Sequence, residues 1–492
     1  MGVDDYIRDV IQKGDKGSAL LAAKTAPTLN NSKFAEVLDY GNVKLPVLRV
    51  PDDCYVVVHS TSGDPKPDDF QARAESLVPR LVKQANKIHV LPMAFSNIID
   101  SATGENSYLE SVADSLVEQA DKFGVAIMNG ENAILGNRLG WRTHVNVSGT
   151  MTSRVSKKHH QLPIDSIPGT FFVDGDEYAV FDPQGQAVFI NSDGVGTKTE
   201  FYERSGNYVP AVRDLLAMVL DDASKIGATA KVVSGVVEVN NTPPSLEMAG
   251  YFNNYITKIV GEMGILGIMQ VEQVGDRITS YENNLPAYNI NGSAVSIINE
   301  EMLKKPLVPG EGEHLIAIRG KPNPRSNGIT DKRKMMIDLF GLEWHETDVG
   351  KQFLEFLAEP STILYTVFNK LISERLATSV YHMSGGAYNG KLAKPLAEHD
   401  LFVHLEFPFR PDWREWTFVG RGFTSARDAY GKWPMGNDGF VATSDPDKAK
   451  SLIESHGLEA RAVGQIEKAV NGRTGVELEH HNGQTIYFSG TD

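Results

Sequence analysis

The chain has 492 residues, of which 41% are hydrophobic and 23% charged, a composition typical of a globular protein with more than one domain. It carries 48 Lys and Arg against 63 Asp and Glu, a formal net charge of −15. Because nucleic acids and anionic membranes are polyanions, we expect no bulk binding to either. The single cysteine, Cys54, excludes an internal disulfide framework, a Cys-rich zinc site and an iron–sulfur cluster, and favours a cytoplasmic location.

The sequence gives no indication of secretion or membrane insertion. The first residues lack the apolar segment of a signal peptide, and no apolar run approaches the roughly 18 residues of a membrane span. Charge, cysteine content and hydropathy together predict a soluble, multi-domain enzyme that acts on small molecules.

After a polar lead-in over residues 1–53, the chain alternates between strand and helix patterns. A valine-rich run predicts a buried strand, apolar residues at helical spacing predict two helices, and Gly124 closes the second of these. The predicted elements are a strand at 54–60, helices at 70–94 and 109–123, and strands at 125–128 and 143–151. We assign residues 54–152 to one domain, followed by a polar connector at 153–186.

The same order of elements returns in residues 187–305. The predicted elements are a strand at 187–192, a helix that Pro210 opens and Gly227 ends, a helix at 246–264, and strands at 267–276 and 287–298. This repetition predicts an internal duplication shifted by roughly 130–145 residues. It matches Lys66 with Lys198 and Gly130-Glu131 with Gly275-Asp276. The alternative is the ordinary recurrence of strands and helices in an α+β protein.

Residues 306–492 form the last predicted domain. Its predicted elements are strands at 314–318, 475–480 and 484–490, helices at 332–340 and 363–376, and a final helix that Ser444 or Asp445 caps and Gly457 ends. The aromatic and arginine-containing stretch at 407–418 is interpreted as packing or an interface rather than RNA binding, because the chain is so acidic.

The segment SDGVGTKTE (192–200) directly follows a predicted strand. Its glycines let backbone N–H groups approach an anion closely, Thr197 offers a hydroxyl and Lys198 a positive charge. Asp193 could hold a metal, so the segment suits a nucleotide polyphosphate with Mg²⁺. The segment is neither a Walker A loop nor a GxGxxG motif. The alternative is a glycine-rich hairpin with a solvated lysine.

Two adjacent carboxylates, Asp221 and Asp222, lie late in an otherwise apolar helix pattern. Burying them unpaired would be costly, and a Mg²⁺ ion would relieve that cost. The alternative is an exposed helix end with two solvated acids. The corresponding part of residues 54–152 has no acid pair, and its loop reads STSGDPK (60–66). If the duplication holds, this first copy has lost the phosphate and metal chemistry.

Four further turns carry candidate groups. Ser326-Asn327-Gly328 precedes a helix and presents N–H groups to an anion, and the Gly-Gly turn in HMSGGAYNGKL (382–392) does the same. His382 is either a proton-transfer residue or a packed strand histidine. The turn NGEN (129–132) and its counterpart VGDR (274–277) place carboxylates at strand ends, where α/β sites often lie, or are ordinary turns.

Together these motifs resemble the aminoimidazole ribonucleotide synthetase family, also called phosphoribosylformylglycinamidine cyclo-ligase. The matching segments are SDGVGTK (192–198), DLLAMVLDDASKIGA (214–228), RSNG (325–328), YHMSGGAYNGKL (381–392) and WPMGNDGFV (433–441). The wider superfamily includes an amidotransferase, selenophosphate synthetase, thiamin-monophosphate kinase and a hydrogenase-maturation factor.

The resemblance implies a mixed α+β and α/β fold. Two copies of a synthetase-type N-terminal domain, paired like a barrel, precede an α/β substrate domain. It implies that ATP phosphorylates the formamide oxygen of formylglycinamidine ribonucleotide before the imidazole ring closes. The implied site residues are Gly194, Val195, Gly196, Thr197 and Lys198 for phosphates, Asp193, Asp221 and Asp222 for Mg²⁺, Ser326, Asn327, Gly328, Ser384, Gly385 and Gly386 for the ribonucleotide substrate, and Lys198 and His382 for catalysis.

One departure from the family bears on assembly. The family has a Gly-Gly-Glu-Thr turn after the second helix, where this chain reads VGDR, and the glutamate survives only in the first copy, as Glu131. The family acts as a dimer of its first domain. We therefore expect residues 54–152 to imitate the dimer partner within one chain and to contribute Glu131; the alternatives are a first copy that only caps a sheet, or a homodimer. Another ATP-using enzyme of the superfamily and a non-catalytic nucleotide-binding scaffold remain the competing functions.

Overall fold

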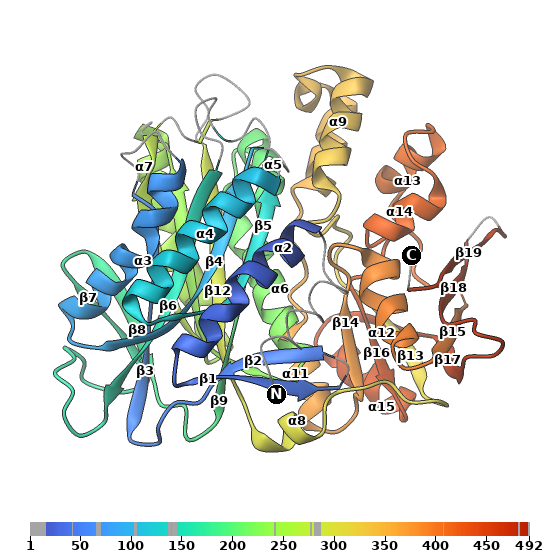
Figure 1. Ribbon diagram of the computed structural model, residues 1–492. Helices are drawn as coiled ribbons and strands as arrows, with labels where there is room; N and C mark the ends of the chain where they lie inside the picture. Colours follow the sequence, from blue (N-terminus) through green and yellow to red (C-terminus); the bar gives the residue numbers. More distant parts are fainter. Residues whose placement is uncertain are drawn as a thin grey trace. The chain divides into compact units, whose positions relative to one another are not determined.

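The computed structural model describes residues 16–41, 43–64, 70–102, 106–135, 139, 145–240, 243–275, 278–279, 287–406, 408–480 and 483–490. The chain forms two compact units. Unit 1 comprises residues 1–203 and 228–305, and unit 2 comprises residues 204–227 and 306–492. The mixed α/β fold class expected from the sequence is confirmed, with three β-sheets covered by helices (Figure 1). Within the described residues, no helix is both long enough and apolar enough to cross a bilayer.

The first sheet of unit 1 has six strands in the order β5-β4-β6-β3-β8-β7. Its strands are β3 (Cys54–Ser62), β4 (Leu91–Ser101), β5 (Ala126–Ile134), β6 (Val145–Ser156), β7 (Gly169–Val173) and β8 (Asp176–Phe181). Helices α3 (Phe70–Lys87) and α4 (Asn106–Phe123) lie side by side against this sheet, and α2 (Lys16–Thr25) packs on α4 (Figure 1). The apolar faces of these helices and strands form one buried cluster, which the helical spacing of Leu77, Leu81 and Val112 makes possible.

The second sheet of unit 1 has six strands in the order β1-β2-β9-β12-β10-β11. Its strands are β1 (Ala35–Tyr40), β2 (Val43–Leu48), β9 (Ala187–Gly194), β10 (Thr229–Val239), β11 (Leu266–Gln273) and β12 (Tyr288–Ile298). Helix α7 (Pro243–Glu262) packs on β10 and β11, and the short helices η1 (Ala26–Asn31), η3 (Gly196–Lys198), α5 (Thr199–Ser205) and α8 (Glu300–Lys304) connect the strands.

The two sheets share one strand order and one register. Reversing the second order gives β11-β10-β12-β9 followed by a hairpin, which parallels β5-β4-β6-β3 followed by a hairpin. Ser96 pairs with Thr150 as Ser234 pairs with Ser293. The hairpin preceding each set of strands joins the other sheet, because β2 pairs with β9 and β8 pairs with β3. The internal duplication stays a prediction, and this shared topology is the observation behind it.

The register changes one of the expected correspondences. The spacing that relates Ser60 to Ser192 also relates Lys66 to Lys198, although Lys66 itself lies outside the described residues. Glu131 of β5, however, pairs with Ile98 of β4. The residue of β10 that corresponds to Ile98 is Val236, and Val236 pairs with Gln270 of β11. The register therefore favours a match of Glu131 with Gln270, whereas the expected partner, Asp276, lies outside the described residues and its match stays a prediction. The sequence pattern matched the turns NGEN (129–132) and VGDR (274–277), whereas the strand register matches positions along β5 and β11.

Two parts of the predicted element order are also wrong. Strands β4 and β10 were not predicted, and residues 91–94 belong to β4 rather than to a helix. Nearly every residue of both strands is buried, so they lack the alternation that marks a half-exposed strand. The expected polar connector at 153–186 contains the end of β6 and the hairpin of β7 and β8. This hairpin has an exposed face, which explains its polar sequence.

The two sheets of unit 1 pack face to face. Residues from both contribute to one apolar cluster, with Val56, Val58 and Ala94 from the first and Val188 and Ile190 from the second. Five serines and a threonine extend the contact between the sheets through hydrogen bonds that repeat with the same symmetry. The Oγ atoms of Ser60 and Ser234 lie 2.5 Å apart, Ser60 also contacts Thr150, and the same arrangement joins Ser96, Ser192 and Ser293. The sheet contact is therefore specific as well as apolar.

A cluster of buried polar residues lies at one end of this contact. Asp100 and Glu238 are both fully buried, and Asn289 Nδ2 donates to Asp100 Oδ2 at 2.7 Å and to Glu238 Oε2 at 3.2 Å. Asn291 donates to Asp100 and Asn146 to Glu238. Each carboxylate retains one oxygen with no hydrogen-bond partner among the described residues. Burial raises the pKa of Asp100 to about 6, and burial together with the charge of Asp100 raises the pKa of Glu238 to about 8.

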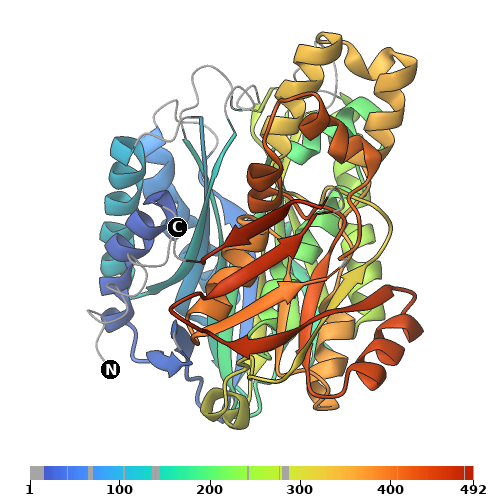
Figure 2. The ribbon, with the colours of Figure 1, turned by 90° about the vertical axis from the view of Figure 1, so that its right-hand side faces the viewer.

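Unit 2 is built on a seven-stranded sheet in the order β14-β16-β13-β17-β15-β18-β19, drawn from yellow through orange to red in Figure 2. Its strands are β13 (His314–Arg319), β14 (Ser379–His382), β15 (Leu401–Leu405), β16 (Gly439–Thr443), β17 (Glu459–Lys468), β18 (Gly475–Glu479) and β19 (Thr485–Phe488). Its helices are α6 (Ala211–Ser224), α9 (Ile329–Phe340), η5 (Trp344–Glu346), α10 (Asp348–Leu357), α11 (Tyr365–Ser373), η6 (Tyr388–Ala393), α12 (Lys394–Ala397), α13 (Trp413–Gly420), α14 (Ala426–Lys432) and α15 (Pro446–Ser455). The predicted cap of the last helix is confirmed, because the Asp445 side chain accepts a hydrogen bond from Lys448 N.

Candidate functional site

The glycine-containing loop lies at the end of β9 in unit 1. A Cβ atom on Gly194 would lie 2.3 Å from Asn291 Oδ1, and Gly196 has a φ of +62°, so both positions require glycine. Asp193 Oδ1 accepts a hydrogen bond from Gly194 N, and Val195 N donates to Ile290 O. The expected loop is therefore a defined turn whose half-buried residues Asp193 and Gly194 are accessible to solvent.

Lys198 does not lie where a solvated phosphate-binding lysine would. Its side chain is fully buried, and its Nζ lies 5.8 Å from the centre of the Tyr202 ring. Thr197 is also buried, and Thr199 Oγ1 donates to Gly196 O, which closes the first turn of the following helix. Because its side chain is fully buried, Lys198 belongs to the interior that supports the loop. The groups of the loop that remain accessible are the backbone near Gly194 and the Asp193 carboxylate.

The strand that carries Glu131 lies against the strand that carries this loop. Strands β5 and β9 are in contact although they belong to different sheets. Asn129 Nδ2 donates to Ile190 O at 3.4 Å, and Ser96 bonds to Ser192. Glu131 itself is half-buried in β5. The fold of unit 1 thus brings the expected first-copy residue into the neighbourhood of the second-copy loop.

The symmetry-related position in the first copy is filled by an ion pair. Thr61 takes the place there that Asp193 takes in β9. Thr61 Oγ1 donates to Glu272 Oε1 at 2.7 Å, and Arg80 Nη2 donates to the same oxygen at 3.0 Å. Protein side chains therefore occupy the position that the loop leaves accessible in the second copy.

The two adjacent carboxylates on α6, both in unit 2, have different surroundings. Asp221 is fully buried; its Oδ2 accepts from Arg325 Nη2 at 2.9 Å and its Oδ1 from Leu364 N at 2.8 Å. Burial raises the pKa of Asp221 to about 7, against the attraction of Arg325. Both oxygens of Asp221 are thus engaged in holding α6 within unit 2, which does not fit a metal ligand.

Asp222, by contrast, is accessible and strongly ionised. Its side chain is 28% exposed, its Oδ1 lies 2.9 Å from His382 Nε2, and it forms an ion pair with Lys225. Although burial opposes ionisation, the charges of Lys225 and Lys391 and the hydrogen bond from His382 hold the pKa of Asp222 well below its usual range. A permanently ionised, partly exposed carboxylate fits a divalent cation.

His382 is held neutral by its surroundings. Burial lowers the pKa of His382 to about 3, more than the neighbouring Asp222 raises it. The Nε2 atom therefore carries the proton and donates to Asp222, with Ser384 Oγ 3.3 Å away. Its Nδ1 atom is buried and has no hydrogen-bond partner among the described residues. His382 thus fixes the orientation of Asp222 and keeps one lone pair available.

The two glycine-containing turns of unit 2 lie next to each other. Asn327 Nδ2 donates to Met383 O at 2.9 Å. Gly328 has a φ of +60°, and a Cβ atom there would lie 2.0 Å from Trp433 Nε1. Gly386 has a φ of +82° and precedes Ala387, which has an unusual positive φ of 35°. Such conformations persist only where the surrounding structure enforces them, so both turns are defined features of the unit.

The accessible groups at these turns suit an anion. Gly328 is the N-terminal cap of the 12-residue helix α9 and supplies no side chain to satisfy the first N–H groups. Ser326 Oγ is buried without a partner among the described residues, Ser384 is half-buried, and Gly385 is exposed. The expected group Ser326-Asn327-Gly328 and Ser384-Gly385-Gly386 is therefore assembled within one unit.

The sequence reasoning did not identify the residues that hold these turns. Arg325 joins Asp221 to the first turn, and its Nη1 lies 3.6 Å from Asp438 Oδ1. Asp438 also accepts from Gly320 N, Asn323 Nδ2 and Thr362 Oγ1. Both residues stand inside segments that matched the family, RSNG and WPMGNDGFV, which was the only available indication of their importance.

The expected family resemblance is confirmed by curated relatives. No family model matches the chain. The phosphoribosylformylglycinamidine cyclo-ligase of Methanococcus maripaludis strain C5 is 23% identical over 309 residues, covering 61% of this chain and 84% of the relative. The enzyme of the same name from Pyrococcus horikoshii is 26% identical over 211 residues, covering 42% of this chain and 59% of the relative.

Solved structures show a weaker likeness. The thiamine-monophosphate kinase of Stenotrophomonas maltophilia covers 63% of this chain and 91% of its own, with a TM-score of 0.43 and 13% identity. E. coli HypE, a hydrogenase maturation protein, covers 61% and 84%, with a TM-score of 0.41 and 15% identity. These scores are too low to carry an argument about this chain.

Proposed function

We propose that this chain is an ATP-dependent enzyme that phosphorylates an oxygen atom of a ribonucleotide, and that its reaction is the cyclo-ligase reaction. ATP would phosphorylate the formamide oxygen of formylglycinamidine ribonucleotide. The amidine nitrogen would then attack the activated carbon, phosphate would leave, and aminoimidazole ribonucleotide and ADP would be released. The support is the cyclo-ligase relatives together with the partly exposed, ionised Asp222 that His382 orients.

The phosphate-binding role falls to the backbone of residues 194–197 rather than to the Lys198 ammonium. The glycines let N–H groups approach an anion, whereas the Lys198 side chain is buried. Of the adjacent carboxylates in unit 2, Asp222 is the one that would hold Mg²⁺, since the Asp221 oxygens are already engaged. When bound, the ion would neutralise charge on the transferred phosphoryl group.

The substrate-binding role falls to the paired turns of unit 2. N–H groups at the start of α9 and the Ser326 and Ser384 hydroxyls would bind the ribonucleotide phosphate or the formamide group. His382 acts as a positioning residue for Asp222, because a histidine whose pKa lies near 3 accepts a proton poorly at neutral pH. Catalysis then depends on alignment and charge neutralisation more than on a strong base.

The first copy would serve as an internal dimer partner. Its strand β5 contacts β9 and carries Glu131, while its own loop position is occupied by Arg80 and Glu272. One nucleotide site per chain follows from this arrangement. The alternative of a homodimer would be detected by light scattering as a particle of twice the mass of 53.9 kDa.

The decisive experiment incubates the protein with ATP, Mg²⁺ and formylglycinamidine ribonucleotide and follows ADP, phosphate and the imidazole product. We expect all three, and Asp222→Asn should lower kcat by at least about 100-fold. Asp338→Asn, an exposed aspartate on α9, is the matched control and should leave kcat unchanged. Tight ATP binding without product would instead support the scaffold function, and product formation by Asp222→Asn at the normal rate would refute the site.

A further inference from the structure

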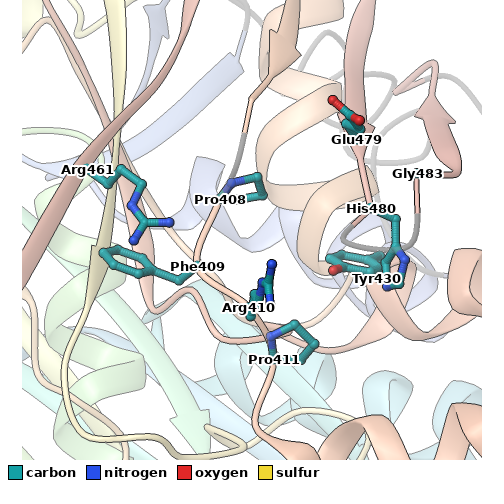
Figure 3. A pocket seen from close by; sticks show the side chains of 9 residues that line it. All are labelled: Pro408, Phe409, Arg410, Pro411, Tyr430, Arg461, Glu479, His480 and Gly483. Carbon is teal, nitrogen blue, oxygen red and sulfur yellow. The ribbon is translucent and has the colours of Figure 1, made fainter.

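Unit 2 contains a cavity that is separate from every residue of the candidate site. The cavity has a volume of about 190 Å³. Figure 3 shows that the segment 408–411 forms one side of it, with Tyr430 and His480 on the other. This segment lies inside the aromatic and arginine-containing stretch that the proposed function does not use.

Arg410 supplies a positive charge that the fold leaves unused. Its side chain makes no ion pair or hydrogen bond to any described residue, and Figure 3 shows it standing between Phe409 and Tyr430. A second guanidinium, that of Arg461, stacks over the Phe409 ring at 4.7 Å. Glu479 is the one acid among the described lining residues, and its carboxylate is turned away from Arg410 (Figure 3). Two guanidinium groups beside an aromatic ring are the usual means of binding an oxyanion attached to a flat group.

The opposite side of the cavity offers a hydrogen-bond donor and flat rings. Tyr430 is 2% exposed, yet its hydroxyl makes no hydrogen bond within the described part of the chain. Burial and the nearby charge of Glu415 raise the pKa of Tyr430, so the hydroxyl keeps its proton. His480 packs on Trp416 with ring centres 4.4 Å apart and meets the edge of Tyr430. The Tyr430 hydroxyl is not fully enclosed by the protein, so it can donate a hydrogen bond to a ligand oxygen in the cavity.

The side of the cavity that carries Arg410 is rigid before any ligand binds. Asn437 Oδ1 accepts from Phe409 N at 3.1 Å, and Asn437 Nδ2 donates to Phe409 O at 3.0 Å. The backbone of Arg410 fits directly against Gly436, where a Cβ atom would lie 2.3 Å from Arg410 O. Such preorganisation lowers the entropic cost of binding a ligand. It is typical of a binding site, whereas an ordinary surface loop does not need it.

We propose that this cavity binds a small phosphate monoester whose phosphate contacts Arg410, Arg461 and the Tyr430 hydroxyl and whose planar group packs against His480; the Phe409 ring already carries the Arg319 and Arg461 guanidinium groups. The site is independent of the nucleotide and substrate sites, because it shares no residue with them. The volume admits a phosphate with one ring and excludes a whole dinucleotide.

Phenyl phosphate is the probe, measured by isothermal titration calorimetry on the full chain. We expect saturable binding to the unmodified protein, weaker binding of inorganic phosphate and no binding of phenol. Arg410→Ala should weaken phenyl phosphate binding at least about tenfold, and Tyr430→Phe about three- to tenfold. Arg421→Ala, an exposed arginine outside the cavity, is the matched control and should bind normally.

The outcome also separates this site from the proposed substrate site. If Ser384→Ala removes phenyl phosphate binding while Arg410→Ala and Tyr430→Phe leave it unchanged, the probe occupies the turns of unit 2 and the cavity proposal is overturned. Absence of any binding to the unmodified protein overturns it equally. Because Tyr430→Phe removes only an oxygen atom, its loss of affinity cannot be ascribed to misfolding once its thermal unfolding matches that of the unmodified protein.

Discussion

Replacing Glu238 by glutamine tests the electrostatics of the contact between the two sheets of unit 1. Glu238 is fully buried beside Asp100, and its pKa is raised from 4.5 to about 8 by burial first and by the Asp100 charge second. The folded state therefore retains a proton that the unfolded chain releases above pH 4.5. Stability is accordingly lost as the pH rises from 4.5 through about 8.

The magnitude follows from the shift. A change from 4.5 to about 8 corresponds to about 5 kcal/mol of unfolding free energy lost at pH 8.5 and above. Glutamine has nearly the same shape and no charge, so Glu238→Gln should regain most of this free energy at pH 8.5 and little at pH 5. Asn146 and Asn289, which donate to the carboxylate, would still find an amide oxygen to accept their hydrogen bonds.

The assay is urea unfolding of the full chain at pH values from 5 to 9. We expect the unfolding free energy of the unmodified protein to fall across this range and that of Glu238→Gln to fall much less. Glu118→Gln, at an exposed position of α4, is the control and should follow the unmodified protein. A flat profile for the unmodified protein, or the same slope in Glu238→Gln, would refute the assignment of a shared, protonated cluster between the sheets.

Three further predictions concern the site and its frame. Lys198→Met keeps an unbranched buried side chain but no charge; because the loop backbone binds the phosphates, we expect kcat within about threefold of normal, and a loss of kcat of more than about tenfold at an unchanged melting temperature would return the Lys198 ammonium to the machinery. Titration with a non-hydrolysable ATP analogue should give one site per chain, because Arg80 and Glu272 fill the second position, and two sites would contradict this. Gly328→Ala should lower the unfolding free energy of unit 2 by more than about 2 kcal/mol in chemical denaturation, because the new Cβ would collide with a tryptophan. Gly341→Ala has open space around its Cβ and should cost only about 1 kcal/mol. Equal costs for the two variants would show that the turn at Gly328 can relax.

Several features of this protein could be predicted from local sequence because their causes are local. Gly194 and Gly196 follow a buried strand, and the turn that they form needs backbone conformations and close approaches that only glycine permits. Asp445 and Pro446 start the last helix by capping chemistry that acts over a few residues. Apolar runs in the sequence also predicted most of the strands in both halves of unit 1. Strands β4 and β10 were missed, because burial on both faces removes the alternation of apolar and polar residues.

The different roles of neighbouring or similar residues were decided only by tertiary structure. Asp221 and Asp222 are identical neighbours, yet the first meets Arg325 from another part of unit 2 and the second remains partly exposed beside His382.

The sequence by itself determined the turns, caps and strands, together with the kinds of groups that can bind phosphate. Only the packing of distant segments decided that Lys198 is buried, that Asp100 and Glu238 share a dry contact between two sheets, and that Arg410 faces Tyr430 across a cavity. The physical reason is that backbone conformation depends on neighbours along the chain. The ionisation and accessibility of a side chain depend instead on whichever groups the fold brings within a few ångströms of it.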